Sequence, residues 1–220
     1  RGPFHMTEPT DLPDLRLELM QRGLGEESAP ADPMVLFDDW LELAISLAIH
    51  NANAMAVATA DPAGRPSVRN VLLRGRFDGG LGFYTNYESR KGVELDSNPL
   101  AEVLFSWLAL ERQVRFGGSV SRMSPRRSDE YYATRERESR ISAIASPQSR
   151  VVGSRAELEA WHADIETSLG SADPVRPAHW GGYLLIPYTI EFWQGRPHRL
   201  HDRLLYQRVE GRWTVSRLAP

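Results

Sequence analysis

The chain contains no cysteine, which excludes disulfide bridges and thiolate metal sites. It also lacks any apolar run of the roughly 18 residues that a membrane-spanning helix needs, and its start has no apolar signal-peptide core. Lys and Arg number 26 against 29 Asp and Glu, a formal net charge of −3, so the basic surplus of a general nucleic-acid binder is missing. These absences predict a cytoplasmic protein without a membrane or nucleic-acid partner, whose local basic clusters bind particular anions.

The length of 220 residues and the 41% hydrophobic content suit one domain with a sizeable core. Residues 1–5 precede Met6 and read like a remnant of an expression tag. A polar segment with several prolines and glycines then surrounds one short apolar patch, which predicts a mobile arm. We therefore expect the tag remnant and arm over 1–30 and a single folded domain over 31–220.

The hydrophobic period changes along the chain from that of a helix to that of strands. Asp32-Pro33 forms an N-cap and a first-turn proline, followed by apolar residues at helical spacing to about residue 49. Ser89, Ser124 and Ser154 are predicted to cap three further helices, with Glu157 completing a capping box. Alternating apolar segments between turn residues predict strands at 55–60, 67–75, 81–85, 101–107, 113–121, 180–186, 189–193, 204–208 and 213–217.

Many short strands with a few inserted helices indicate a mostly β fold of the α+β class, a closed or split β-barrel with peripheral helices. The densest group of functional side chains lies at 191–203, Glu-Phe-Trp-Gln-Gly-Arg-Pro-His-Arg-Leu-His-Asp-Arg, where two predicted strands meet. A tryptophan beside forked cations suits a flat, anionic ligand. A hairpin with a solvated basic turn explains the same composition, so the residues alone leave both interpretations open.

A second cationic group combines Arg69, on a predicted strand, with Ser89-Arg90-Lys91 at a predicted helix start. Backbone N–H groups and the helix dipole favour an anion at such a start, so a phosphate site is one interpretation. A solvated helix face is the other, and it is the commoner fate of an isolated Arg-Lys pair.

Several motifs, taken in order, resemble the pyridoxine/pyridoxamine 5′-phosphate oxidase family, whose members bind FMN on a split β-barrel. The resemblance extends from about residue 31 to residue 220, and several spaced matches in order are more specific than any one alone. The matching segments are Asn53-Ala54-Met55, Arg69-Asn70-Val71-Leu72-Leu73, Tyr84-Thr85-Asn86, Ser89-Arg90-Lys91, Glu111-Arg112-Gln113, Gln148-Ser149, Trp180-Gly181-Gly182, the 191–203 segment and Arg217-Leu218-Ala219-Pro220.

The resemblance implies FMN as the cofactor. No metal is expected, because the histidines lack paired ligand spacing and the chain has no cysteine. The resemblance places FMN contacts at Arg69, Asn70, Val71, Leu72, Leu73, Arg74, Tyr84, Thr85, Arg90, Lys91, Gln113, Gln148, Ser149, Trp193 and Arg203. It places substrate contacts at Arg74, Tyr131, Arg135, Ser139, Arg199, Leu200 and His201, of which Arg199 and His201 are the catalytic pair. The cations are expected to meet the FMN phosphate, and Gln113 and Trp193 its ring.

Three segments depart from the family's usual sequence. Arg74 stands where lysine is usual, which exchanges a point ammonium for a planar fork. The segment 135–144 lacks the usual proline, glycine and tryptophan, which changes its stiffness, and 16–19 keeps two residues of the usual Arg-Arg-Glu-Tyr. The FMN residues persist while the substrate side drifts, so FMN is better supported than the exact substrate.

The implied activity is oxidation of pyridoxine 5′-phosphate or pyridoxamine 5′-phosphate to pyridoxal 5′-phosphate. Hydride passes from C4′ to N5 of FMN, O2 reoxidises the flavin and H2O2 is released, in a homodimer with FMN at the subunit interface. One alternative is a diverged oxidase of another substrate, as in phenazine biosynthesis, which the drift at 136–144 favours. The other is a flavin- or pyridoxal phosphate-binding protein without turnover, which the presence of Arg199 and His201 disfavours.

Overall fold

The computed structural model describes residues 11–220, so the predicted tag remnant and the start of the predicted arm lie outside the described residues. The chain divides into two compact units, each built from separate stretches of sequence. The first combines the described residues up to Val57 with Glu102–Gly118 and Pro187–Pro220, and the second combines Ala58–Ala101 with Ser119–Ile186. The prediction of a single domain over 31–220 stays a prediction.

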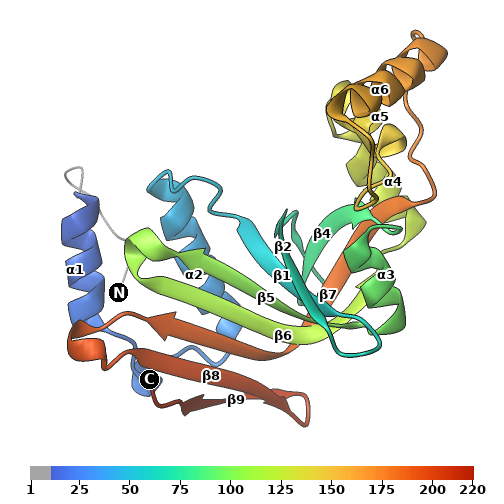
Figure 1. Ribbon diagram of the computed structural model, residues 1–220. Helices are drawn as coiled ribbons and strands as arrows, with labels where there is room; N and C mark the ends of the chain where they lie inside the picture. The colour runs from blue at the N-terminus through green and yellow to red at the C-terminus, as the bar shows by residue number, and fades with distance from the viewer. Residues whose placement is uncertain (1–10) are drawn as a thin grey trace. The chain divides into compact units, whose positions relative to one another are not determined.

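The first unit places helix α2 against strands of its sheet (Figure 1). Phe37 of α2 is fully buried, and its ring centroid lies 4.9 Å from those of both Phe105 and Phe116. Trp40 meets Phe192 edge to face at 5.3 Å. The apolar stripe of the predicted helix is therefore core. The elements wholly in this unit are α1 (Leu12–Arg22), η1 (Glu26–Ser28), α2 (Pro33–Ser46), η2 (Leu108–Leu110), η3 (Pro197–Arg199), β8 (Asp202–Val209) and β9 (Arg212–Arg217).

The second unit holds most of the inserted helices. Helices α5 and α6 pack against each other (Figure 1), and β4 pairs antiparallel with β7, from Leu81 opposite Leu185 to Asn86 opposite Trp180. The elements wholly in this unit are β2 (Pro66–Leu72), β3 (Arg76–Phe77), β4 (Gly80–Asn86), α3 (Arg90–Ser97), α4 (Pro125–Ala133), α5 (Arg137–Ala145) and α6 (Arg155–Leu169).

Four strands contribute residues to both units: β1 (Ala54–Ala60), β5 (Leu100–Trp107), β6 (Arg112–Arg122) and β7 (Trp180–Gln194). The strands pair in the order β2-β1-β5-β6-β7-β4-β3, with β8 on β7 and β9 on β8. This large sheet, with helices inserted between its strands, confirms the predicted α+β class. No helix within residues 11–220 has the length and apolar content that crossing a bilayer requires.

Helix starts follow the predicted caps. The side chain of Asp32 accepts a hydrogen bond from Met34 N at 2.9 Å, and Ser89, Ser124 and Ser154 each accept one from the backbone N–H three residues later. Glu157 accepts from Gly153 N at 2.7 Å instead of from its capping partner. Because these bonds satisfy N–H groups that the helix itself leaves unpaired, they set where each helix begins.

Two features of the sheet and helices differ from the sequence prediction. The predicted strands 180–186 and 189–193 form one strand, β7, which continues through Pro187. Pro187 is tolerated because it lies between the residues that pair with β4 and those that pair with β8. Helix α5 was not predicted, since its short apolar pattern has no side-chain N-cap.

The described part of the predicted arm forms α1 and η1 and contacts the C-terminal strands. Leu19 is 3% exposed. Arg217 of β9 donates to both carboxylate oxygens of Glu26 at 2.8 and 2.7 Å and to Asp202 at 2.6 Å. Arg196 donates to Gln21 O at 2.8 Å. These bonds join residues 21–26 to the hairpin that carries the 191–203 segment, and movement of the arm stays a prediction.

Gly92 lets the start of α3 lie against the preceding turn, because a Cβ there would overlap the backbone carbonyl of Tyr87. Gly92→Ala is expected to lower the free energy of unfolding by about 1–3 kcal/mol, the usual cost of overpacking, despite the better helix propensity of alanine. Urea unfolding measures this change. Val93→Ala, at an exposed position of the same helix, should stay within about 0.5 kcal/mol of the native value. Equal stability of the two variants would contradict the steric argument.

Candidate functional site

The residues predicted to meet a phosphate gather in the second unit around Lys91, the only lysine in the sequence. Its Nζ donates to Gln148 Oε1 at 2.8 Å, to Thr85 Oγ1 at 2.9 Å and to Ser89 Oγ at 3.3 Å. The start of α3, strand β4 and the loop after α5 supply these groups. All three acceptors are neutral, so Lys91 has no carboxylate partner within residues 11–220.

Burial and the neighbouring Arg69 lower the pKa of Lys91 to about 8. The side chain is 7% exposed, and a buried ammonium costs free energy unless an opposite charge compensates for it. An anionic ligand would provide that charge. The environment of Lys91 therefore has the electrostatics of an anion site.

Arg69 is held on β2 by a cluster of short polar side chains. It donates to Thr59 Oγ1 at 2.5 Å and to Ser67 Oγ, and lies 3.4 Å from the carboxylate of Glu94. Burial raises the pKa of Glu94, but hydrogen bonds from Ser67, Thr59 and Arg90 outweigh it and hold the value at about 2. Glu94 is thus charged near neutral pH and orients Arg69 and Arg90.

A cavity of about 290 Å³ lies beside this cluster and brings most of the predicted residues of the second unit together. Two further cations, Arg74 and Arg135, reach it from β2's end and from the turn after α4. Its lining consists of Asn70, Val71, Leu72, Arg74, Tyr84, Thr85, Lys91, Tyr131, Arg135, Gln148 and Trp180. Basic groups and aromatic rings thus share one cavity.

Parallel aromatic rings line the cavity. Tyr84 and Tyr131 stack with centroids 3.9 Å apart, and Trp180 lies parallel to Tyr131 at 6.2 Å. The guanidinium of Arg135 lies 4.6 Å from the centroid of Trp180, and its buried Nη1 has no hydrogen-bond partner among residues 11–220. Tyr132 is 2% exposed and belongs to the core, so Tyr131 is the tyrosine of the pair that faces the cavity.

A second cavity of about 200 Å³, in the first unit, contains Gln113, Trp193 and Arg203. Glu191, which is 7% exposed, accepts from Arg203 Nε at 2.8 Å and also pairs with Arg115. Sequence reasoning missed Arg115 and Glu191 as site residues. Strand periodicity was the available signal, since each lies two residues from a predicted site residue and so faces the same side of its strand.

The hairpin between β7 and β8 holds the predicted catalytic pair. His198 and Arg199 have φ of 60° and 61°, a left-handed conformation uncommon outside glycine. His201 Nδ1 accepts from Arg196 N at 3.1 Å, and the His201 ring lies 4.7 Å from that of Trp193. Because Nδ1 accepts, the neutral ring carries its proton on Nε2.

Eight predicted residues line neither cavity. Arg69 and His201 contact the clusters described above, Leu73 is buried, and Arg90 is an exposed residue that bonds to Glu94. Ser139 is half-buried on α5, while Ser149, Arg199 and Leu200 are exposed. The structure thus brings most of the predicted set into two groups, one within each unit, and leaves Ser139, Ser149, Arg199 and Leu200 outside both cavities.

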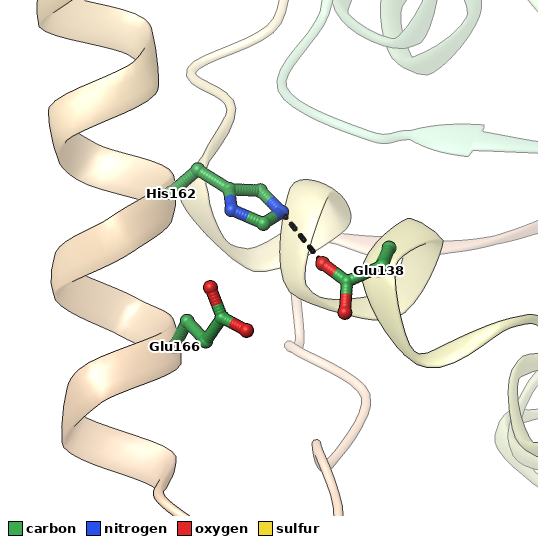
Figure 2. Close-up of side chains that lie close together, drawn as sticks. All are labelled: Glu138, His162 and Glu166. Carbon is green, nitrogen blue, oxygen red and sulfur yellow. Dashed lines mark ion pairs between the residues drawn. The ribbon is translucent and has the colours of Figure 1, made fainter.

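Helices α5 and α6 also carry a group that sequence reasoning missed because α5 was not predicted. Figure 2 shows His162 pointing at Glu138, with Glu166 one helical turn along from His162. His162 Nε2 lies 3.6 Å from the Glu138 carboxylate, and one ligand-type atom from each of the three residues lies within 4.8 Å of the others. The ion pair ties α5 to α6, and the absence of a metal cofactor stays a prediction.

Two family models match the chain. "Pyridoxamine 5′-phosphate oxidase" covers residues 41–167, and "Pyridoxine 5′-phosphate oxidase C-terminal dimerisation region" covers residues 180–220. The pyridoxine/pyridoxamine 5′-phosphate oxidase of Burkholderia thailandensis is 50% identical over 96% of this chain and 100% of its own length. That of Paraburkholderia phymatum is 51% identical over 95% of this chain and 99% of its own length.

Solved structures show the same fold. PhzG from Burkholderia lata, crystallised with tetrahydrophenazine-1-carboxylic acid, matches with a TM-score of 0.83 and 32% identity over 90% of this chain and 98% of that one. A pyridoxamine 5′-phosphate oxidase-related, FMN-binding protein from Nostoc punctiforme has a TM-score of 0.67 and 20% identity, over 90% of this chain and 100% of that one.

Replacing Lys91 by methionine should reveal its depressed pKa in the ligand-free protein. The pKa of an unfolded lysine is about 10.4, whereas burial lowers the pKa of folded Lys91 to about 8. At a pH between these two pKa values, the unfolded chain therefore binds more protons than the folded one. The native protein should therefore gain stability over Lys91→Met as pH rises from 8 to 10. Urea unfolding of both proteins at several pH values measures the difference, in which the other titrating groups cancel. A flat or falling difference would refute the depressed pKa.

Proposed function

This chain belongs to the pyridoxine/pyridoxamine 5′-phosphate oxidase family, and we propose that it oxidises pyridoxine 5′-phosphate or pyridoxamine 5′-phosphate to pyridoxal 5′-phosphate with FMN. The observation that carries the proposal is the cavity of the second unit, where Arg74, Arg135 and Lys91 share one space with stacked aromatic rings. The cations suit the phosphate group of such a substrate, and the flat aromatic rings suit its pyridine ring. Identity of about 50% over nearly the whole chain supports the same activity.

The residues present fit FMN. Lys91 is a buried cation whose hydrogen-bond acceptors among residues 11–220 are all neutral, and together with Arg69 it would hold the flavin phosphate. Gln113, Trp193 and Arg203 would hold the ring, with Glu191 fixing the Arg203 guanidinium. When bound, FMN supplies the two-electron acceptor for the substrate and passes the electrons to O2, which gives H2O2.

The substrate phosphate is proposed to bind Arg74, Tyr131 and Arg135. Arg135 Nη1 is buried without a partner among residues 11–220, and a phosphate oxygen would satisfy it with a charge-assisted hydrogen bond. Ser139, on α5, is proposed to add a hydroxyl. Because Trp180 packs on both Arg135 and Tyr131, these groups are ordered before the substrate arrives, which lowers the entropic cost of binding.

His201 is proposed to act through its Nε2–H. The backbone N–H of Arg196 donates to Nδ1 at 3.1 Å, which fixes the tautomer and turns Nε2 outward as a donor toward the ring hydroxyl of the substrate. Arg199 and Leu200 follow in the exposed turn and are proposed to contact the pyridine ring and hold C4′ in position for hydride transfer.

We propose that the active form is a homodimer. The dimerisation-region model covers residues 180–220, which include Trp193, Arg199, His201 and Arg203. Glu191, Trp193 and Arg203 of the second cavity thus lie in the segment with that description, whereas Gln113 and Arg115 precede it. A flavin at the subunit interface would then take contacts from both chains.

A diverged oxidase is the second candidate. The likeness to PhzG, at 32% identity and a TM-score of 0.83, favours a tricyclic substrate. The 136–144 segment, which departs from the usual family sequence, also favours a diverged substrate. Arg74 and Arg135 in one cavity favour a phosphorylated substrate instead, because the buried Nη1 of Arg135 has no hydrogen-bond partner among residues 11–220 and a phosphate oxygen would supply one.

Anaerobic mixing of the FMN-loaded protein with each B6 phosphate tests the proposal. We expect rapid loss of the oxidised-flavin absorbance with at least one substrate, followed by H2O2 and pyridoxal 5′-phosphate when air is admitted. A flavin that binds but stays oxidised with both substrates would support the diverged oxidase. Failure to bind FMN would reject the assignment.

His201→Asn should lower kcat/KM by about tenfold or more while the protein retains FMN. Leaving the ring hydroxyl of the bound substrate without its hydrogen bond costs about 1–3 kcal/mol, and about 1.36 kcal/mol corresponds to a factor of ten in rate. His198→Asn is the matched control, since His198 is an exposed neighbour and asparagine tolerates its left-handed backbone. Equal kcat/KM for the two variants, from steady-state assays, would remove His201 from the proposed role.

A further inference from the structure

Lys91 carries the only side-chain amine of the protein, among 25 arginines. Guanidinium groups do not lose their proton near neutral pH and do not attack carbonyl compounds. Among side chains, amine chemistry with an aldehyde is therefore confined to one position, and that position lines the 290 Å³ cavity.

The environment of Lys91 suits a nucleophilic amine. Its three hydrogen-bond partners are two hydroxyls and an amide oxygen, so no carboxylate among residues 11–220 holds the proton on Nζ. Burial and Arg69 lower the pKa of the group to about 8, which leaves an appreciable neutral fraction near pH 7.5. Lysines in proteins that form imines are activated by the same means, desolvation and a nearby cation.

The rest of the cavity would hold a phosphorylated aromatic aldehyde. Arg74 and Arg135 reach the same space as Lys91, and Arg135 has a buried donor without a partner among the described residues. The stacked rings of Tyr84 and Tyr131 give it a flat wall. An aldehyde anchored by its phosphate would thus be kept near the amine at high effective concentration.

We propose that Lys91 of the flavin-free protein forms a reversible imine with pyridoxal 5′-phosphate, a phosphorylated aromatic aldehyde. The inference rests on the proposed function, which makes this aldehyde the product. The neutral Nζ attacks the carbonyl carbon and forms the C–N bond; the resulting carbinolamine then loses its oxygen as water, leaving C=N. No electrons are exchanged with an outside reagent. The imine nitrogen then takes up one proton from solvent, and the protonated imine has one N–H to donate to Gln148.

Imine formation and FMN binding exclude each other in this proposal. The amine that would bind the flavin phosphate becomes the atom bonded to the aldehyde carbon, and the aldehyde occupies the cavity. Accumulated product would therefore slow the loading of FMN into newly made protein. This is product control of cofactor loading, separate from competition with substrate in the loaded enzyme.

Borohydride trapping tests the proposal on the full chain after FMN is removed and retention of the fold is checked by circular dichroism. Pyridoxal 5′-phosphate is added, the imine is reduced to a stable amine, and the labelled peptide is identified by mass spectrometry. We expect one label, on Lys91. A label on the amino terminus alone, or none, would overturn the proposal.

Three matched arms define the site. FMN at about one hundred times its dissociation constant leaves about one chain in a hundred free, so labelling should fall about a hundredfold. Pyridoxal, which lacks the phosphate, should label at least about tenfold more slowly, and Lys91→Arg should take no internal label. Labelling of Lys91 that is indifferent to FMN and to the phosphate would reject the cavity as its cause.

The oxidase assay on FMN-loaded protein distinguishes this inference from the proposed function. Turnover of the B6 phosphates without a label on Lys91 would reject the imine and leave the oxidase intact. A label on Lys91 without turnover would reject the proposed oxidation but support the aldehyde site, because imine formation in the flavin-free protein does not require catalysis.

Discussion

A buried positive charge without a carboxylate partner is the constraint on which the candidate site depends. Lys91 gives its protons to two hydroxyls and an amide oxygen, so the protein solvates the ammonium without neutralising it. Burial and the nearby Arg69 disfavour the charged form and lower the pKa of Lys91 to about 8. A buried cation with this pKa shift and no carboxylate partner is a candidate binding group, because an anionic ligand would complete its charge balance.

Four other cations near the site, Arg69, Arg90, Arg115 and Arg203, lie against carboxylates. Glu191 bonds Arg203 and Arg115, and Glu94 bonds Arg90 and lies beside Arg69. These pairs fix guanidinium direction, because a carboxylate accepts the planar fork in defined geometries. The site thus combines arginines oriented by carboxylates with one buried lysine whose hydrogen-bond partners are all neutral. The planar guanidinium and the compact ammonium differ in the geometry with which they can bind an anion.

Much of the fold follows from local sequence. The caps Asp32, Ser89, Ser124 and Ser154 begin helices as predicted, since a short polar side chain before a helical pattern satisfies free N–H groups wherever it occurs. Strand continuity through Pro187 and the existence of α5 were not predicted. Both depend on neighbours distant in sequence: Pro187 is tolerated because β7 changes partner there, and α5 is supported by packing on α6.

The sequence by itself determined the family, the cofactor expectation and the residue types of the site, because spaced motifs preserve chemistry in order along the chain. Only the tertiary structure decided that Tyr131 and not Tyr132 lines the cavity, that Glu191 holds Arg203, and that Lys91 has only neutral hydrogen-bond partners. Burial and partnership are set by residues far apart in sequence, such as Lys91 and Gln148, and a one-dimensional pattern does not contain those distances.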